Sequence, residues 1–267
     1  MDQVNYTPPP SVVAGLAGLL VLYVLCVGRL RDRFAGSAPV PLAQRVAFIG
    51  GLFIMLIALA TPLDTIGDQY LFTAHMIQHL LLTLVAAPLL LGGTPAWLLR
   101  ELLRATRLTG FVRWARHPIV AFFAFNIVFS LAHVPAFYEL TLSNELVHAL
   151  EHLVFIGTAM LMWMPVLSPV PDIAARYPAL GQVGYLFLQT VPASLLGAVL
   201  SSTASAYYPT YILAPRITSL SPLEDQQLGG LIMWVGSGLY FLIATGVVFF
   251  VWAAREEAAN RRPLGVH

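Results

Sequence analysis

Residues 70–92 read YLFTAHMIQHLLLTLVAAPLLLG, an apolar run with two histidines in its first half. A helix needs about 20 mostly apolar residues to cross a hydrocarbon core of roughly 30 Å, so this run is long enough to span a membrane. Ionisable side chains inside a span usually face the interior of a helix bundle or a watery cavity. The run therefore predicts a membrane helix whose histidine face has a function.

Further apolar runs extend this interpretation to the rest of the chain. They lie near residues 11–28, 44–61, 118–134, 146–167, 180–202 and 227–253. The run at 118–134 is the shortest, because Pro118 and Pro135 bracket it. Together these runs predict an all-α, polytopic membrane protein with seven transmembrane helices, organised as one domain over residues 1–267.

The composition supports a membrane protein and excludes several other classes. Hydrophobic residues make up 58% of the chain and charged residues 10%, against about 25% charged residues in a soluble domain. The net charge of +1 and the absence of lysine give no reason to expect nucleic acid as a partner. The single cysteine, Cys26, excludes an internal disulfide and a cysteine-rich metal site.

Arginine is distributed unevenly between alternate loops, which predicts the orientation of the chain. Short cytoplasmic loops are enriched in basic residues. One set of segments carries Arg29, Arg31, Arg33, Arg45, Arg100, Arg104, Arg107, Arg113, Arg116, Arg176, Arg255, Arg261 and Arg262. The other set holds Arg216 and the acidic residues Asp2, Asp64, Asp68, Glu139, Glu145, Glu224 and Asp225. We therefore expect the N-terminus outside and the C-terminus in the cytoplasm, with the first helix retained as a span.

Two pairs of histidines have the spacing of metal ligands on a helix. His75 and His79 are four residues apart, and His148 and His152 repeat that spacing in the run at 146–167. Residues at i and i+4 lie on one face of a helix, so each pair can present two imidazoles to one ion. His133, at the outer end of the run at 118–134, is expected at the same level.

The predicted depths allow the two pairs to meet. With a rise of about 1.5 Å per residue, His75 and His79 lie roughly 7 and 13 Å inside, and His148 and His152 roughly 3 and 9 Å. Asp68 precedes His75 by seven residues and shares the histidine face if the helix begins that early. Asp225 is expected at the same rim. In contrast, Ser221-Pro222-Leu223-Glu224 has the form of a capping box, which makes Glu224 a helix cap.

The ligand types narrow the choice of metal without fixing it. Imidazole suits zinc, copper, iron and nickel, carboxylate shifts the preference towards zinc or iron, and thioether shifts it towards Cu(I). Met76 lies about 100° round the helix from His75, which makes it a marginal ligand. A purely structural interpretation, in which the histidines only form hydrogen bonds between helices, is less favoured for two pairs than for one lone histidine.

At these residues the sequence resembles the bacterial CtaG-type, or caa3-type, cytochrome c oxidase assembly proteins. The resemblance covers nearly all seven spans and rests on the order and spacing of several motifs. These are His75 to Leu80, Ala86 to Leu89, His133-Val134-Pro135 with Tyr138, Glu151-His152, and Ser221 to Gly230. It implies a multi-pass protein of the bacterial cytoplasmic membrane that handles copper on the outer side and has oxidase subunits as partners. A homo-oligomer is also compatible with it.

The leading hypothesis is a copper-binding assembly factor that breaks no bond. Its predicted ligands are His75, His79, His133, His148, His152, Asp68 and Asp225. The first alternative is a seven-helix zinc hydrolase acting on a lipid-like substrate, in which three histidines hold zinc and a carboxylate acts as base. The second alternative is a membrane cytochrome with a bis-histidine haem, which an absorption spectrum would reveal.

Overall fold

The computed structural model describes residues 6–261, apart from 168, 171–172 and 174–176. The described part consists of helices and their connections, without strands. Asp2, Arg176, Arg262 and His267 lie outside the described residues.

Six helices are long and apolar enough to cross a membrane. Two of them are continuous helical runs that change geometry along their length: residues 72–93 and residues 222–260. The six are α1 (Pro10–Val27), α2 (Leu42–Leu59), α4 with η2 and α5 (Phe72–Leu80, Leu81–Ala86, Ala87–Gly93), α10 (Glu145–Leu167), α11 (Ala179–Ser202), and α13 with η3 and α14 (Pro222–Leu231, Ile232–Gly236, Ser237–Asn260). They coincide with six of the seven predicted spans.

The remaining predicted span is bent. Helix α8 (Pro118–Ala132) has 15 residues, and it forms a seventh span only together with α7 (Thr109–Ala115), from which it is bent by 90°. The bend falls at Arg116 and His117, directly before Pro118. Proline disfavours a helical conformation in the residue before it, and its fixed φ suits the first turn of a new helix.

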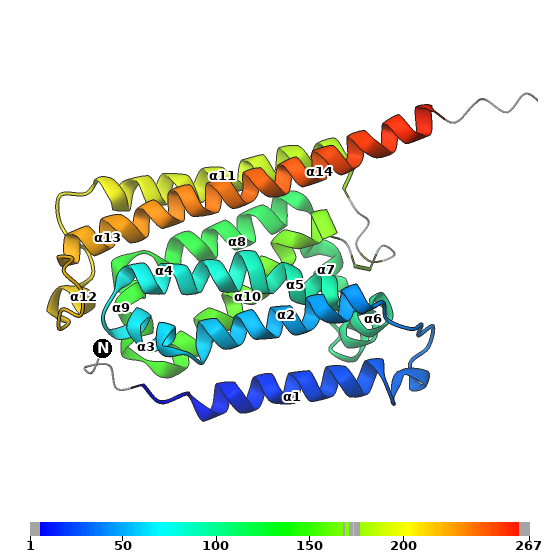
Figure 1. The fold of residues 1–267 in the computed structure, drawn as a ribbon, viewed down its shortest axis with the longest axis horizontal. Helices are drawn as coiled ribbons and strands as arrows, with labels where there is room; N and C mark the ends of the chain where they lie inside the picture. The colour runs from blue at the N-terminus through cyan, green and yellow to red at the C-terminus, as the bar shows by residue number, and fades with distance from the viewer. Residues whose placement is uncertain (1–5, 168, 171–172, 174–176, 262–267) are drawn as a thin grey trace, which may run out of the picture.

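Short helices that the hydropathy pattern does not predict cover the two ends of the bundle (Figure 1). Helices α3 (Pro62–Gln69), α9 (Pro135–Ser143) and α12 (Pro209–Leu213) lie at one end, and α6 (Ala96–Ala105) and α7 lie at the other. The connection from α1 to α2, with the short helix η1 (Arg31–Arg33), also lies at the end of α6 and α7. The two ends therefore differ in the elements and charges they carry.

Local sequence explains where many of these helices begin. Proline occupies the first turn of α1, α3, α8, α9, α12 and α13, where its missing N–H is no loss. The side chain of Thr61 caps α3 by accepting a hydrogen bond from the amide of Leu63. At α13, Ser221 and Glu224 form the predicted capping box with reciprocal hydrogen bonds. The structure thus confirms Glu224 as a cap.

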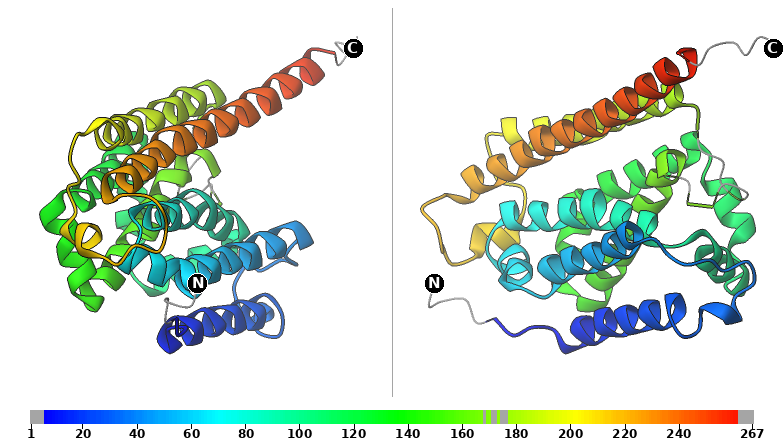
Figure 2. Two further views of the ribbon diagram at one scale, coloured as in Figure 1. Left: turned by 60° about the vertical axis from the view of Figure 1, so that its left-hand side comes forward. Right: turned by 45° about the vertical axis from the view of Figure 1, so that its right-hand side comes forward.

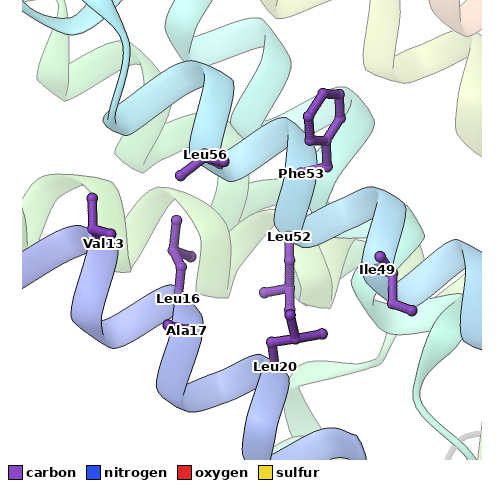
Figure 3. A pocket seen from close by; sticks show the side chains of 8 residues that line it. All are labelled: Val13, Leu16, Ala17, Leu20, Ile49, Leu52, Phe53 and Leu56. Carbon is purple, nitrogen blue, oxygen red and sulfur yellow. The ribbon is translucent and has the colours of Figure 1, made fainter. Parts of the chain in front are cut away.

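Helix α10 packs against α5, η2, α8 and α9, while α11 packs along α14. Helix α1 lies at the periphery and has only Leu16, Tyr23 and Cys26 buried (Figure 2). Its contact with α2 leaves an apolar groove whose lining includes Leu16 and Leu20 of α1 and Leu52 and Leu56 of α2 (Figure 3). A groove of this composition is suited to the hydrocarbon of a lipid bilayer.

The π-helical segment η2 begins two residues after His79. A π-turn changes the hydrogen-bonding partners of the backbone carbonyls, and such turns often occur at functional sites. Here the carbonyl of Thr83 accepts a hydrogen bond from the indole N–H of Trp163 in α10 at 3.1 Å. This bond ties the two histidine-bearing helices together below the histidines.

Candidate metal centre

The two histidine pairs lie on facing helices, as their spacing predicts. In α4, the rings of His75 and His79 are 4.2 Å apart between centroids, and in α10 those of His148 and His152 are 4.3 Å apart. Across the helix interface, His75 lies 5.7 Å from His148, and His79 lies 5.5 Å from His152. The four imidazoles therefore form one cluster near the end of the bundle that α3 and α9 cover.

Asp68 joins this cluster from a different element than predicted. The condition under which Asp68 would share the histidine face of one continuous helix is not met, because α4 begins at Phe72 and Asp68 belongs to the separate helix α3. Its two carboxylate oxygens lie 3.4 Å from Nδ1 of His75 and 3.4 Å from Nδ1 of His148. The carboxylate thus bridges one histidine of each pair.

Close packing of α3 on α4 places Asp68. A Cβ atom at Gly67 would lie 3.0 Å from both the backbone nitrogen and Cα of His75, which is tighter than most contacts of real side chains. A residue without a side chain is therefore needed for this approach. The adjacent Asp68 is held beside His75 as a result.

His133 lies at the C-terminal end of α8, and its ring centroid is 6.3 Å from that of His79. Its Nδ1 donates a hydrogen bond to the carbonyl of Phe129 at 2.7 Å, and its Nε2 lies 3.3 Å from the sulfur of Met76. The hydroxyl of Tyr208 donates to the carbonyl of His133 at 2.9 Å. The predicted fifth histidine therefore borders the cluster with a fixed ring orientation.

Glu151 is part of the cluster, although spacing alone did not select it as a ligand. One oxygen of its carboxylate and one nitrogen each of His75 and His79 all lie within 4.8 Å of one another. The same holds for Asp68, His75 and His148. Glu151 follows His148 by three residues, so the helical stripe that selected the histidines also contains it. Glu145, which begins α10 on that stripe, is exposed.

The structure gives Asp225 a different role from the predicted one. Neither group of potential ligands includes it among the described residues. Its carboxylate accepts hydrogen bonds from the backbone amides of Phe72 at 2.7 Å and Thr73 at 3.2 Å. These amides are free at the start of α4, where a negative charge is also favoured by the helix dipole. Asp225 thus caps the histidine helix from α13.

Three buried tyrosine side chains hold the short helices over the cluster. The hydroxyls of Tyr138 and Tyr211 are hydrogen-bonded at 2.8 Å, and Tyr211 donates to the carbonyl of Gly67 at 2.7 Å. Burial raises the pKa of Tyr138, Tyr208 and Tyr211, so their hydroxyls keep their protons and act as donors. The ring of Tyr138 also lies 5.1 Å from that of His75.

Many side-chain nitrogen and oxygen atoms of the cluster are buried without a hydrogen-bonding partner. They are Oδ1 of Asp68, both ring nitrogens of His75, both ring nitrogens of His79, Nε2 of His148, both carboxylate oxygens of Glu151 and Nε2 of His152. Buried polar atoms are normally hydrogen-bonded, because leaving one unpaired costs about 1 to 3 kcal/mol. Imidazole nitrogen and carboxylate oxygen are also ligands for transition metals. These unpaired nitrogen and oxygen atoms are therefore suited to binding a metal ion.

The carboxylates of α3 are in an environment that disfavours charge. Burial raises the pKa of Asp68 to about 6, although the nearby His148 opposes this shift. Burial, with a smaller contribution from Asp68, raises the pKa of Asp64 to about 7, and the hydrogen bond from Gln78 opposes it. A cation placed between these groups would relieve the cost of their negative charges.

The fold and the cluster together define a multi-pass α-helical membrane protein with a buried group of histidines and carboxylates near one end of the bundle. The chain belongs to the family described as cytochrome c oxidase caa3 assembly factor, whose sequence profile matches residues 21–255. The resemblance inferred from the motifs is therefore confirmed.

Relatives among curated proteins are uncharacterised. Proteins of Mycobacterium bovis and Mycobacterium tuberculosis are each 23% identical to this chain over 266 residues, which is 93% of the chain and 40% of the relative. A protein of Mycobacterium leprae is 23% identical over 249 residues, 86% of the chain and 37% of the relative. The chain thus spans about two fifths of their length, and its organisation as one domain stays a prediction. No solved structure matches the chain significantly.

Proposed function

We propose that this chain binds copper in the histidine cluster and passes it to a subunit of cytochrome c oxidase during assembly. The membership of an oxidase assembly family supplies the context. The observation that carries the proposal is the set of buried imidazole nitrogens, with Oδ1 of Asp68, that have no hydrogen-bonding partner. Such a set is costly for a structural role alone and is suited to a metal ion.

The proposed ligands are His75, His79, His133, His148, His152 and Asp68, and we add Glu151 because of its distance from His75 and His79. Asp225 is left out, because backbone amides of α4 occupy its carboxylate. Copper is preferred over zinc and iron because the partner proposed from the family is a haem–copper oxidase, while imidazole accepts all three metals. Binding and release of an ion require no bond to be broken.

The proposed orientation places the cluster on the outer side of the bacterial cytoplasmic membrane. Arg31 and Arg33 in η1, Arg100 and Arg104 in α6, and Arg113 in α7 belong to elements at one end of the bundle (Figure 1). The cluster lies near the other end. With the arginine-rich end in the cytoplasm, the ligands face the compartment from which copper would reach an oxidase.

Metal analysis of the purified chain tests this function directly. The chain is loaded with copper in detergent, freed of unbound ion and analysed for metal content. We expect the double variant His79→Gln/His152→Gln to lose most of its copper, whereas His117→Gln, in the bend before α8, keeps the wild-type amount. Equal copper in all three proteins would refute the proposal.

A zinc hydrolase is the second candidate, and one observation favours it. His75, His79 and Glu151 form a group of two histidines and one glutamate, a ligand set found in catalytic zinc sites. Asp68 would then act as the base for a zinc-bound water. Zinc-dependent turnover of an amide or ester lipid, abolished by Asp68→Asn, would support this function.

The contacts of Asp68 disfavour the haem alternative. The carboxylate of Asp68 reaches both His75 and His148, and it therefore occupies the space between these two rings that a porphyrin would need.

A further inference from the structure

We propose that Met76, His133 and His79 form a soft subsite of the centre that binds Cu(I), separate from the harder subsite of Asp68, His75 and His148. This inference rests on the proposed function and deepens it. It assigns the oxidation state of the bound copper as Cu(I). It also makes Met76 a thioether ligand, although helical spacing alone indicated only a marginal one.

The ring of His133 is held in one tautomer. Its Nδ1 lies 2.7 Å from the carbonyl oxygen of Phe129, which accepts but cannot donate a hydrogen bond. Nδ1 therefore carries a proton, and in the neutral ring Nε2 is left with a free lone pair. His133 is only 4% exposed and has no carboxylate partner in the described part of the chain, so a charged ring would be costly.

The free lone pair of His133 faces the sulfur of Met76, which can also only accept a hydrogen bond. Its Nε2 lies 3.3 Å from the sulfur of Met76, and a thioether has no hydrogen to donate. Two lone pairs in contact in a buried position gain nothing from each other. An ion that binds both atoms removes the conflict, since nitrogen and sulfur ligands of a four-coordinate ion lie about 3.6 Å apart by the usual bond lengths.

His79 supplies the third ligand of this subsite. It follows Met76 by three residues on α4, so both side chains lie on neighbouring positions of one helix face. Both ring nitrogens of His79 are buried without a hydrogen-bonding partner. The ring is 6.3 Å from that of His133, which places His133 and Met76 beside the same histidine.

Packing from α13 fixes the side chain of Met76 in this position. Met76 is 1% exposed, and a Cβ atom at Gly229 would lie 3.3 Å from its Cγ and 2.4 Å from the ring of Phe72. Helix α13 therefore lies directly against Met76. Met162 is equally buried in the apolar core, yet its sulfur makes no polar contact among the described residues.

The two subsites differ in the metal they favour. Asp68, His75 and His148 offer oxygen and nitrogen, a combination suited to zinc or Cu(II), whereas a thioether with imidazole favours Cu(I). His75 and His79 are adjacent, with ring centroids 4.2 Å apart, so the two subsites share one cluster. The inner, soft subsite would hold copper in its reduced form.

Binding measurements on the full chain in detergent test the subsite. The Cu(I) affinity is measured anaerobically by competition with a chromophoric chelator, and the Zn(II) affinity by a second competition. We expect Met76→Leu, which nearly conserves volume, to lower the Cu(I) affinity by about tenfold or more and to leave the Zn(II) affinity unchanged. Met162→Leu is the matched control and should keep both. Asp68→Asn should weaken Zn(II) binding and spare Cu(I).

X-ray absorption at the copper edge supplies a second readout. The Cu(I)-loaded wild type should show a sulfur scatterer that Met76→Leu removes and Met162→Leu retains. If the wild type binds copper without a sulfur ligand, or if both methionine variants bind Cu(I) equally, the soft subsite is refuted while the proposed function stands. If the wild type binds no copper at all, both proposals fail.

Discussion

The carboxylate of Asp225 accepts a hydrogen bond from the backbone amide of Phe72, 153 positions away in the sequence, at 2.7 Å. The amide of Thr73 donates to the same carboxylate, and the hydroxyl of Thr73 donates to the backbone carbonyl of Asp225. The residue that caps the histidine helix therefore comes from the last membrane helix. Asp225 therefore has a structural role that can be tested separately from metal binding.

Asp225→Asn tests that separation. The two backbone amides donate to different oxygens of the Asp225 carboxylate, and the NH2 group that replaces one oxygen in asparagine cannot accept a hydrogen bond. One backbone N–H is therefore left unpaired, at a cost of about 1 to 3 kcal/mol. We expect a lower resistance to unfolding in an SDS titration, with unchanged copper per chain. Glu224→Gln, at the exposed capping box, is the control and should have the smaller effect. Lost copper at unchanged stability would instead make Asp225 a ligand.

Gly67→Ala tests how the position of α3 controls the centre. The new methyl group would meet the backbone of His75 at 3.0 Å, so α3 has to move and carry Asp68 with it. We expect the Zn(II) affinity to fall by about tenfold, the size of effect seen when groups that orient ligands are lost. Gly110→Ala in α7, where a Cβ meets no atom within 4 Å, should bind Zn(II) as the wild type does. Unchanged Zn(II) affinity in Gly67→Ala would contradict the control of the centre by the position of α3.

The pair of Asn126 and Gln189 predicts a measurable coupling between α8 and α11. The amide of Asn126 donates to Oε1 of Gln189 at 2.8 Å, and both side chains are buried. Hydrogen bonds between membrane helices contribute about 0.6 kcal/mol on average. We expect Asn126→Leu and Gln189→Leu each to destabilise the protein, and the double variant to lose less than the sum of the two. Strict additivity in a double-mutant cycle, measured by SDS titration, would contradict a direct interaction.

The proposed orientation of the chain predicts the accessibility of its two ends. In a Cys26→Ser background, Ser219→Cys lies between α12 and α13, and Ala38→Cys lies between η1 and α2. Both native residues are exposed. We expect a membrane-impermeant maleimide to label Ser219→Cys in intact cells and Ala38→Cys only after permeabilisation. The reverse pattern would place the histidine cluster at the cytoplasmic face.

Sequence alone determined the features that depend on local spacing. The apolar runs located six membrane-length helices, because crossing a hydrocarbon layer requires a minimum length of apolar chain whatever the neighbours are. The interval of four residues put His75 beside His79 and His148 beside His152, because the helical repeat fixes which residues share a face. The capping box at Ser221 and Glu224 followed from four successive positions for the same reason.

Tertiary structure decided which residues from different helices meet. Asp68 reaches His75 only because α3 breaks from α4 and packs back against it, and the contact of His133 with Met76 depends on how α8 approaches α4. Asp225 became a cap because α13 lies at the start of the histidine helix. Spacing along one helix says which side chains share a face, whereas the crossing of two helices is set by packing over their whole length, which no single motif encodes.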